Sequence, residues 1–264
     1  LAIFPETRAI DPYGLGEFLN FGSVLSNRTL FHGVQVLPPD SLWIFDGKEI
    51  ARSSHDNRLR LESQPELPAS VYLEKLEETF ERILPRYLVG EPKCLALTGG
   101  LDTRLIIACA DVRPGELPCL THGGMYKEML DVSIARDVAR TCGQSHRVIP
   151  LDRDFLLTFP EVSAETVYLT DGLADVAQSH LLFLNRIVRN TFKIKITGKY
   201  GSQVIKHLSA FHRPTGYGSD EDLISPDFRQ YSSAAKATFK EHDTGHPLSQ
   251  MVFKEIPWWW SGIS

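Results

Sequence analysis

The clearest hydrophobic pattern in the chain begins at Val71, where apolar residues recur at three- and four-residue intervals with Glu and Lys between them. This spacing predicts an amphipathic helix that ends near Pro85 and Gly90. Its apolar positions are Val71, Leu73, Leu76, Phe80, Ile83 and Leu84. The apolar run at residues 94–97 comes next and is typical of a buried strand in a parallel sheet.

Strand and helix patterns then alternate as far as residue 196. Further strands are predicted at 117–121, 147–149 and 192–196. Helices are predicted at about 102–111, from Asp131 as the cap to about Cys142, over a short stretch from Asp152, and at roughly 178–190. This alternation predicts an α/β fold, in which a doubly wound parallel sheet carries helices on both faces.

The first sixty residues show a weaker pattern. They predict a short helix at 14–21 and a strand at 41–45, which ends in the turn signal Asp46-Gly47. Residues 51–70 are polar and contain two prolines, so they predict a linker. We therefore predict two domains, 1–60 and 61–264.

The composition restricts the kinds of partner that the chain is expected to bind. Of 264 residues, 28 are Lys or Arg and 33 are Asp or Glu, so the formal net charge is -5. Without a basic excess, neither nucleic acid nor a membrane surface is an expected partner. The four cysteines show neither CxxC nor metal-ligand spacing, and no secretory signal opens the chain, so a cytoplasmic protein with reduced thiols is expected. A homo-oligomer is compatible with this sequence.

Two features concern the ends of the sequence. It opens at Leu1 without an initiator Met, and we expect a fragment of a longer protein. The segment 207–264 is less regular and finishes with Trp258–Trp260, which are expected to pack against other residues rather than face solvent.

The segment Thr98-Gly99-Gly100-Leu101-Asp102-Thr103 joins the strand at 94–97 to the next predicted helix. Two glycines allow the backbone to approach an anion and to take angles that strain other residues. The helix start beyond them offers N–H groups and a positive dipole end, and the two threonines add hydroxyl donors. The segment therefore predicts a phosphate-binding loop, although it is neither a Walker A loop nor a GxGxxG fingerprint.

Asp102 distinguishes this loop, because a carboxylate repels a polyphosphate unless a cation lies between them. It is either a Mg²⁺ ligand or simply the cap of the helix, and the pattern alone favours neither.

The loop resembles the Ser-Gly-Gly-x-Asp-Ser loop of ATP pyrophosphatases of the asparagine synthetase family, and both Ser-to-Thr changes keep a hydroxyl. Leu120–Gly123 is similar to the family's second-strand segment beside adenine. The predicted helix from Asp131 and the following His146 also resemble family features, and Thr197-Gly198 is similar to a Ser-Gly pair that contacts the nucleotide. Three N-terminal segments, Leu1–Pro5, Asn27–Val34 and Leu37–Pro39, resemble the end of the family's glutaminase domain and its link to the synthetase domain.

This resemblance implies an ATP-dependent ligase with Mg²⁺. ATP would activate a carboxylate substrate, aspartate or an analogue, as an acyl-adenylate, and ammonia or another amine would displace AMP. Pyrophosphate would bind residues 98–103, with Mg²⁺ on Asp102. Adenosine would be lined by Leu97, Leu120, Thr121, His122, Thr197 and Gly198. A strand order other than 3-2-1-4 around the loop would instead favour a generic doubly wound domain with an unrelated ligand.

The chain departs from the family pattern after the fourth strand. Ser202 and Gln203 stand where the family has Asp and Glu of its metal–pyrophosphate site, so a catalytically impaired nucleotide-binding relative is the alternative. Lys199 either meets phosphate as a point charge or is a solvated surface lysine. The family's N-terminal nucleophilic cysteine has no counterpart here, so glutamine hydrolysis is not expected.

Three further positions have two interpretations each. His122 either stacks on adenine or is a polar loop residue, and Arg104 either reaches phosphate or pairs with a surface acid. Asp171–Asp175 is either a substrate-facing loop or, as we favour, a turn with a helix cap.

Overall fold

The computed structural model describes residues 4–21, 24–25, 27–38, 41–54, 60, 63–124, 128–199, 201 and 225–242. The chain divides into two compact units, one formed by 1–66 with 211–264 and the other by 67–210. The domain boundaries expected from the sequence, 1–60 and 61–264, stay a prediction.

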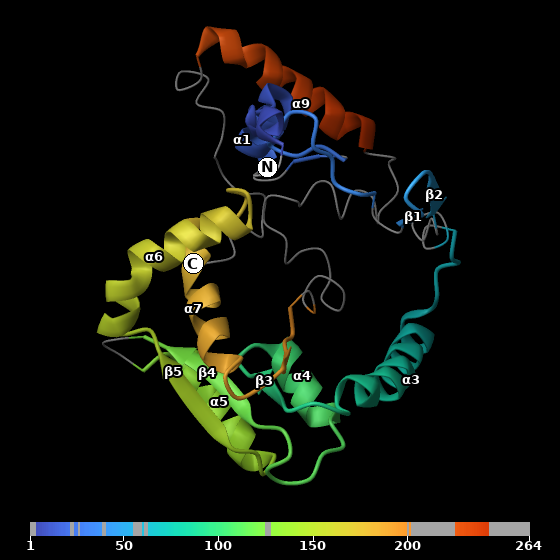
Figure 1. Ribbon diagram of the computed structural model, residues 1–264. Coiled ribbons are helices and arrows are strands. Elements are labelled where there is room, and N and C mark those ends of the chain that lie inside the picture. The colour runs from blue at the N-terminus through green and yellow to red at the C-terminus, as the bar shows by residue number, and fades with distance from the viewer. Residues whose placement is uncertain are drawn as a thin grey trace. The chain divides into compact units, whose positions relative to one another are not determined.

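Unit 67–210 is built on a four-stranded sheet (Figure 1). Its strands are β3 (Lys93–Ala96), β4 (Cys119–Gly123), β5 (His146–Pro150) and β6 (Ile194–Ile196). All neighbours are parallel, and the order across the sheet is β5-β4-β3-β6. Counted from β3 along the chain, this is the order 3-2-1-4, with β3 between its two partners.

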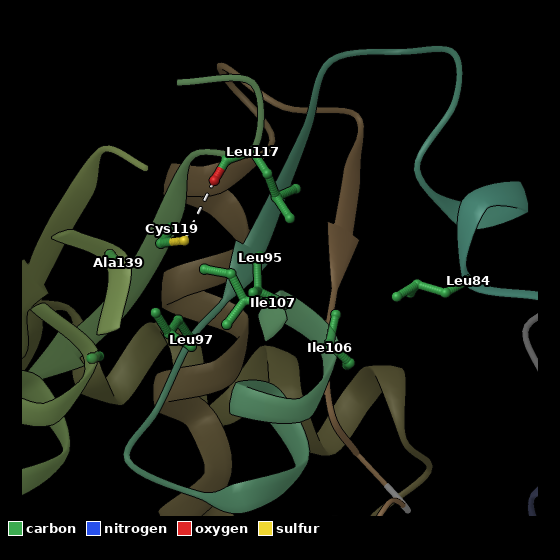
Figure 2. Close-up of a cluster of buried hydrophobic side chains, with 9 residues drawn as sticks. Leu84, Leu95, Leu97, Ile106, Ile107, Leu117, Cys119 and Ala139 are labelled. Carbon is green, nitrogen blue, oxygen red and sulfur yellow. Dashed lines mark hydrogen bonds between the residues drawn. The ribbon is translucent and has the colours of Figure 1, made fainter. Parts of the chain in front are cut away.

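Helices cover both faces of this sheet. They are α3 (Ala69–Tyr87), α4 (Leu101–Cys109), α5 (Leu130–Thr141), α6 (Arg153–Leu169) and α7 (Ser179–Val188). Because side chains alternate along a strand, β3 contributes to two separate cores. Leu95 packs with α4 and α5 on one face (Figure 2), and Cys94 packs with Leu184 and Val188 of α7 on the other. The predicted doubly wound α/β fold is confirmed.

The first core explains why the sequence pattern predicts the strand at 94–97. Leu95, Leu97 and Leu117 are fully buried; in Figure 2, Ile107 of α4 lies beside Leu95 and Leu97, and Ile106 lies toward Leu84. Burying a leucine side chain stabilises the fold by about 1.5–3 kcal/mol. A strand that is buried on both faces has to be apolar throughout, which is the pattern of residues 94–97.

Several helix boundaries differ from the prediction. The end of α3 is as predicted, since its last residue, Tyr87, lies between Pro85 and Gly90; a proline in the last turn removes only one helix hydrogen bond, and the Leu88 amide still bonds to the Pro85 carbonyl. The short helix expected at Asp152 is the 17-residue α6, and Asp152 caps it by accepting from the Asp154 amide. Asp131 is not the cap of α5, since the N-cap is Met129.

Unit 1–66 with 211–264 contains α1 (Pro12–Phe21), β1 (Ser41–Phe45), β2 (Ile50–Ser54) and α9 (Arg229–His242), with short 3-10 helices at Pro5–Arg8 and Pro226–Phe228. Helix α1 packs closely on α9: a Cβ on Gly16 would lie 2.7 Å from the Tyr231 carbonyl oxygen. The Asn20 amide donates to Ser232 Oγ at 2.9 Å. These contacts join two segments from opposite ends of the sequence.

Strands β1 and β2 form an antiparallel hairpin around Asp46-Gly47, with Phe45 paired to Ile50. Gly47 has a φ of +96°, as a tight turn of this kind requires. Residues 51–54 of β2 were predicted as linker, so that prediction was wrong for this segment. Within the described part of the chain, no helix has the length and apolar character needed to cross a membrane. Trp258–Trp260 lie outside the described residues.

Candidate functional site

A cavity of about 450 Å³ lies at the carboxyl ends of β3, β4 and β6, beside α7. This size is typical of small-molecule sites. The cavity is lined by most residues that the sequence singled out: Leu97, Thr98, Gly100, Asp102, Thr103, Leu120, Thr121, His122, Thr197, Gly198 and Lys199. Gly99 and Leu101 are not among the lining residues, and Leu101 is exposed.

The loop at 98–103 is shaped by its own threonines. Thr103 Oγ1 accepts from the Thr98 amide at 3.1 Å, and Thr98 Oγ1 accepts from the Gly100 amide at 3.1 Å. The two hydroxyl oxygens lie 3.1 Å apart. The Thr103 hydroxyl also donates to the Thr98 carbonyl at 3.3 Å, so the hydroxyls fix the turn from β3 into α4.

The two glycines of the loop allow close packing against other residues, and their backbone angles are ordinary. Gly100 has φ -67° and ψ 149°, and neither it nor Gly99 has a positive φ. The expectation of strained angles was therefore wrong. A Cβ on Gly99 would lie 2.6 Å from Asp131 Oδ1, and the Gly99 amide donates to that oxygen at 3.0 Å. The carboxylate that was predicted as a helix cap thus anchors the loop to α5.

Asp102 is the second residue of α4 and lies against the turn after β6. A Cβ on Gly198 would be 2.9 Å from Asp102 Cβ, and one on Gly201 would be 2.8 Å from it. The Gly201 amide donates to the Gly198 carbonyl at 3.0 Å, which keeps this turn tight. Two segments that are distant in sequence are therefore pressed together beside the cavity. Because the N-cap is Gly100, Asp102 is not the cap of α4.

Asp102 is also the one carboxylate among the described residues that line the cavity. The described residues contain no group of three or more His, Cys, Asp or Glu that could hold a metal ion. Mg²⁺ in proteins is commonly held by one or two carboxylates together with substrate phosphates. Asp102 therefore fits a Mg²⁺ ion only if a bound ligand supplies most of the other oxygen atoms.

Thr121 is held in β4 by two hydrogen bonds. Its hydroxyl donates to the Leu97 carbonyl oxygen at 2.6 Å and lies 2.8 Å from His146 Nε2. Since the single hydroxyl hydrogen goes to the carbonyl, His146 Nε2 acts as the donor in this arrangement. Burial lowers the pKa of His146, and the positive charge of Arg136 lowers it further. His146 thus serves to position Thr121.

His122 belongs to β4, so the interpretation as a loop residue was wrong. Its ring is half-buried, lines the cavity and lies 5.5 Å from the ring of His180. Burial is the main reason that the pKa of His122 is lowered; His180 and Lys195 also lower it, and Asp131 opposes them. An imidazole that lines the cavity, with its pKa lowered by burial, is suited to stack on an aromatic ligand.

Two polar residues of the cavity were not predicted from the sequence: Lys195 on β6 and Asn185 on α7. The Lys195 ammonium donates to Asn185 Oδ1. The apolar wall that α7 supplies through Leu181, Leu184 and Val188 was not predicted either. A signal was present: positions 181, 184, 185 and 188 have the spacing of one helix face.

The remaining candidates lie away from the cavity lining. Asp171 has a φ of +53°, and Asp175 Oδ1 accepts from the Ala177 amide at 2.8 Å, so this segment is a turn with a cap, as we favoured. Arg104 does not line the cavity, and its Nε is buried without a hydrogen-bond partner among the described residues. Ser202 and Gln203 lie outside the described residues.

Few known proteins are detectably similar to this chain. No protein-family model and no curated protein matches the chain. Among solved structures, one match is the predicted subunit of tRNA methyltransferase from Methanocaldococcus jannaschii, at 16% identity over 55% of this chain and 75% of that chain. The TM-score of this match is 0.27, so it supports no conclusion about function.

Proposed function

We propose that unit 67–210 binds ATP in this cavity and uses it to adenylate a carboxylate substrate, in the manner of asparagine synthetase. One observation carries the proposal. Residues that resemble the family's nucleotide contacts come from three separate strand ends, and they line one cavity on a sheet of order 3-2-1-4.

The lining suggests how ATP would lie. Leu120, Leu184 and Val188 offer an apolar surface for the base, and His122 offers a ring face. The phosphates would lie toward the start of α4, because helix N-termini favour anions. Lys199 lines the same cavity and would add positive charge there.

The chemistry follows from that placement. A carboxylate oxygen would attack the α-phosphorus, and the bond from that phosphorus to the pyrophosphate oxygen would break. Ammonia or another amine would then attack the acyl carbon and release AMP. The chain would contribute orientation and charge stabilisation rather than a general acid or base. Mg²⁺ held between Asp102 and the phosphates would supply neutralising charge.

The test is a thermal shift with ATP, with and without Mg²⁺, on the wild type, Asp102→Ala and Asp137→Ala. Asp137 is a matched control, because it lies on the exposed surface of α5 and pairs with Arg140. ATP at a hundred times its dissociation constant should add about 2.7 kcal/mol to stability. The Mg²⁺-dependent part of this shift should vanish in Asp102→Ala alone. Absence of any ATP shift in the wild type would refute the proposal.

Catalysis is tested separately, by ATP–pyrophosphate exchange with a panel of carboxylic acids. A second candidate, a nucleotide-binding protein with impaired catalysis, is favoured by Asp102 being the one carboxylate in the described lining. If this second candidate is correct, ATP binds but no carboxylic acid supports ATP–pyrophosphate exchange. The double change Ser202→Asp with Gln203→Glu should then strengthen the Mg²⁺-dependent binding, and unchanged binding would argue against this second candidate.

A further inference from the structure

Two polar residues of the cavity, Lys195 and Asn185, have no role in the ATP proposal, and neither is among the residues that the family resemblance implies. The Lys195 ammonium donates to Asn185 Oδ1. On α7, Asn185 directly follows Leu184 and lies about one turn before Val188, and all three line the cavity. A base that packs on this apolar wall would therefore have one of its edges beside the Asn185 amide.

Lys195 determines which way that amide faces. A lysine ammonium has three donors and no acceptor, so the atom of Asn185 that it meets has to be the oxygen. If the amide turned over, its own N–H groups would face the ammonium and the hydrogen bond would be lost. The oxygen keeps a second lone pair, and among the described residues nothing accepts from the amide nitrogen. Asn185 thus presents one acceptor beside one donor, in a fixed order.

Adenine has the complementary edge. Its 6-amino group donates and the neighbouring ring nitrogen accepts, and an asparagine amide can pair with both at once. A 6-oxopurine such as hypoxanthine carries an oxygen at position 6. One of its edges then presents two acceptors, and the other presents donor and acceptor in the reverse order. A free amide could turn over to meet the reversed order, whereas one held by Lys195 cannot do so without losing its bond.

The separation between this pair and the phosphate loop suits a nucleotide. Lys195 aligns with Cys94 in the sheet, four residues before Thr98, which is roughly 13 Å of strand at 3.3 Å per residue. In an extended nucleotide, the ribose and the base ring lie between the phosphates and the far edge of the base, and together they cover a separation of this order. With the phosphates at the loop, the edge of the base would reach Asn185.

We propose that Asn185 binds the amino group and a ring nitrogen of adenine, and that Lys195 is a positioning residue that holds the amide in the matching orientation. The pair would in this way select adenine over 6-oxopurine nucleotides. This inference rests on the proposed ATP binding for the placement of the base. Recognition of the base can nevertheless be measured without any adenylation.

The experiment is calorimetric titration of the full chain with ATP and with ITP, whose base is hypoxanthine. The wild type should bind ATP about 10- to 100-fold more tightly than ITP, which is the discrimination expected of one bidentate pair. Asn185→Leu removes both hydrogen-bonding groups of the amide. Its affinity for ATP should fall by that factor, to the level of ITP, and its affinity for ITP should change little.

Lys195→Met separates positioning from a general loss of binding. The freed amide can turn over for hypoxanthine, so ITP should bind more tightly relative to ATP and the ratio of the two affinities should fall toward one. Loss of the lysine charge acts on the phosphates of both nucleotides alike, and a merely structural role would also weaken both alike; neither changes the ratio. Lys193→Met is the matched control, because Lys193 is exposed and pairs with Glu91 at 2.9 Å. It should keep the wild-type ratio.

Adenosine and inosine are titrated in parallel, because they test the base without the phosphates. Equal binding of ATP and ITP by the wild type overturns the inference and leaves the proposed function standing. A wild-type ratio that persists in Asn185→Leu or in Lys195→Met overturns it as well, as does preferential binding of ITP. A Lys195-dependent preference for adenosine without any binding of ATP supports the inference and refutes the proposed function. Absence of binding by all four compounds refutes both.

Discussion

The contact between Gly99 and Asp131 gives the sharpest test of how the loop is held. In Gly99→Ala, the new Cβ would lie 2.6 Å from Asp131 Oδ1 and 3.1 Å from Ile134 Cδ1. The first distance is too short, so the carboxylate must move and its hydrogen bond with the amide is lost. Because Gly99 has no positive φ, backbone strain adds nothing. We expect a loss of about 1–2 kcal/mol of local stability.

The prediction becomes stronger as a double-mutant cycle. Asp131→Ala removes the same hydrogen bond and also the atom that causes the clash. Gly99→Ala in that background should therefore cost little more, which gives a coupling of about 1 kcal/mol between the two positions. Asp137→Ala, on the same helix, should instead add to Gly99→Ala without coupling.

The assay is hydrogen exchange of peptides that cover residues 95–104, read by mass spectrometry. Exchange reports local opening, whereas a global unfolding midpoint would mix the two compact units of the chain. Gly99→Ala should speed exchange of this segment several-fold, and Asp131→Ala with Gly99→Ala should be little faster than Asp131→Ala. Strict additivity of the two changes would refute the described contact.

Three other predictions concern the walls of the cavity. Gly198→Ala should lower the melting midpoint and weaken any ATP binding, because its Cβ would lie 2.9 Å from Asp102 Cβ; unchanged binding would contradict this packing. Thr121→Val should cost about 1–3 kcal/mol in chemical denaturation, since it leaves a carbonyl and His146 without their partner. The lowered pKa of His122 means that the unfolded chain binds more protons below about pH 6.5, so stability falls on acidification through that range. His122→Asn should flatten that loss in melts at pH 7.5 and 5.5, and an unaltered pH dependence would disprove the assignment.

The sheet could be predicted because its strands are buried on both faces. Residues 94–97 had to be apolar to serve both cores, and their pattern is unambiguous. Strand β2 could not be recognised, because the side chains of residues 50–53 are exposed and carry no alternation. Its pairing is set by the turn at Asp46-Gly47 and by β1, not by burial.

The site could be predicted only in part, for a related reason. The loop residues are consecutive in sequence, so their chemistry is visible there. Asp131 was interpreted as a cap because the sequence does not show that its carboxylate meets the Gly99 amide across the fold. Lys193 and Lys195 both belong to the strand predicted at 192–196, and only the position of α7 distinguishes Lys195 from the exposed Lys193.

The packing of α1 on α9 has a consequence for how the chain folds. Asn20 and Ser232 touch across 212 positions, and the whole of unit 67–210 is inserted between them. Closing so long a loop is entropically costly, by about 0.6 kcal/mol for each doubling of its flexible length. A folded insert shortens that flexible length, so folding of unit 67–210 lowers the entropic cost of bringing α1 and α9 together. During synthesis, α1 must wait for α9, and the inserted unit has the opportunity to fold first.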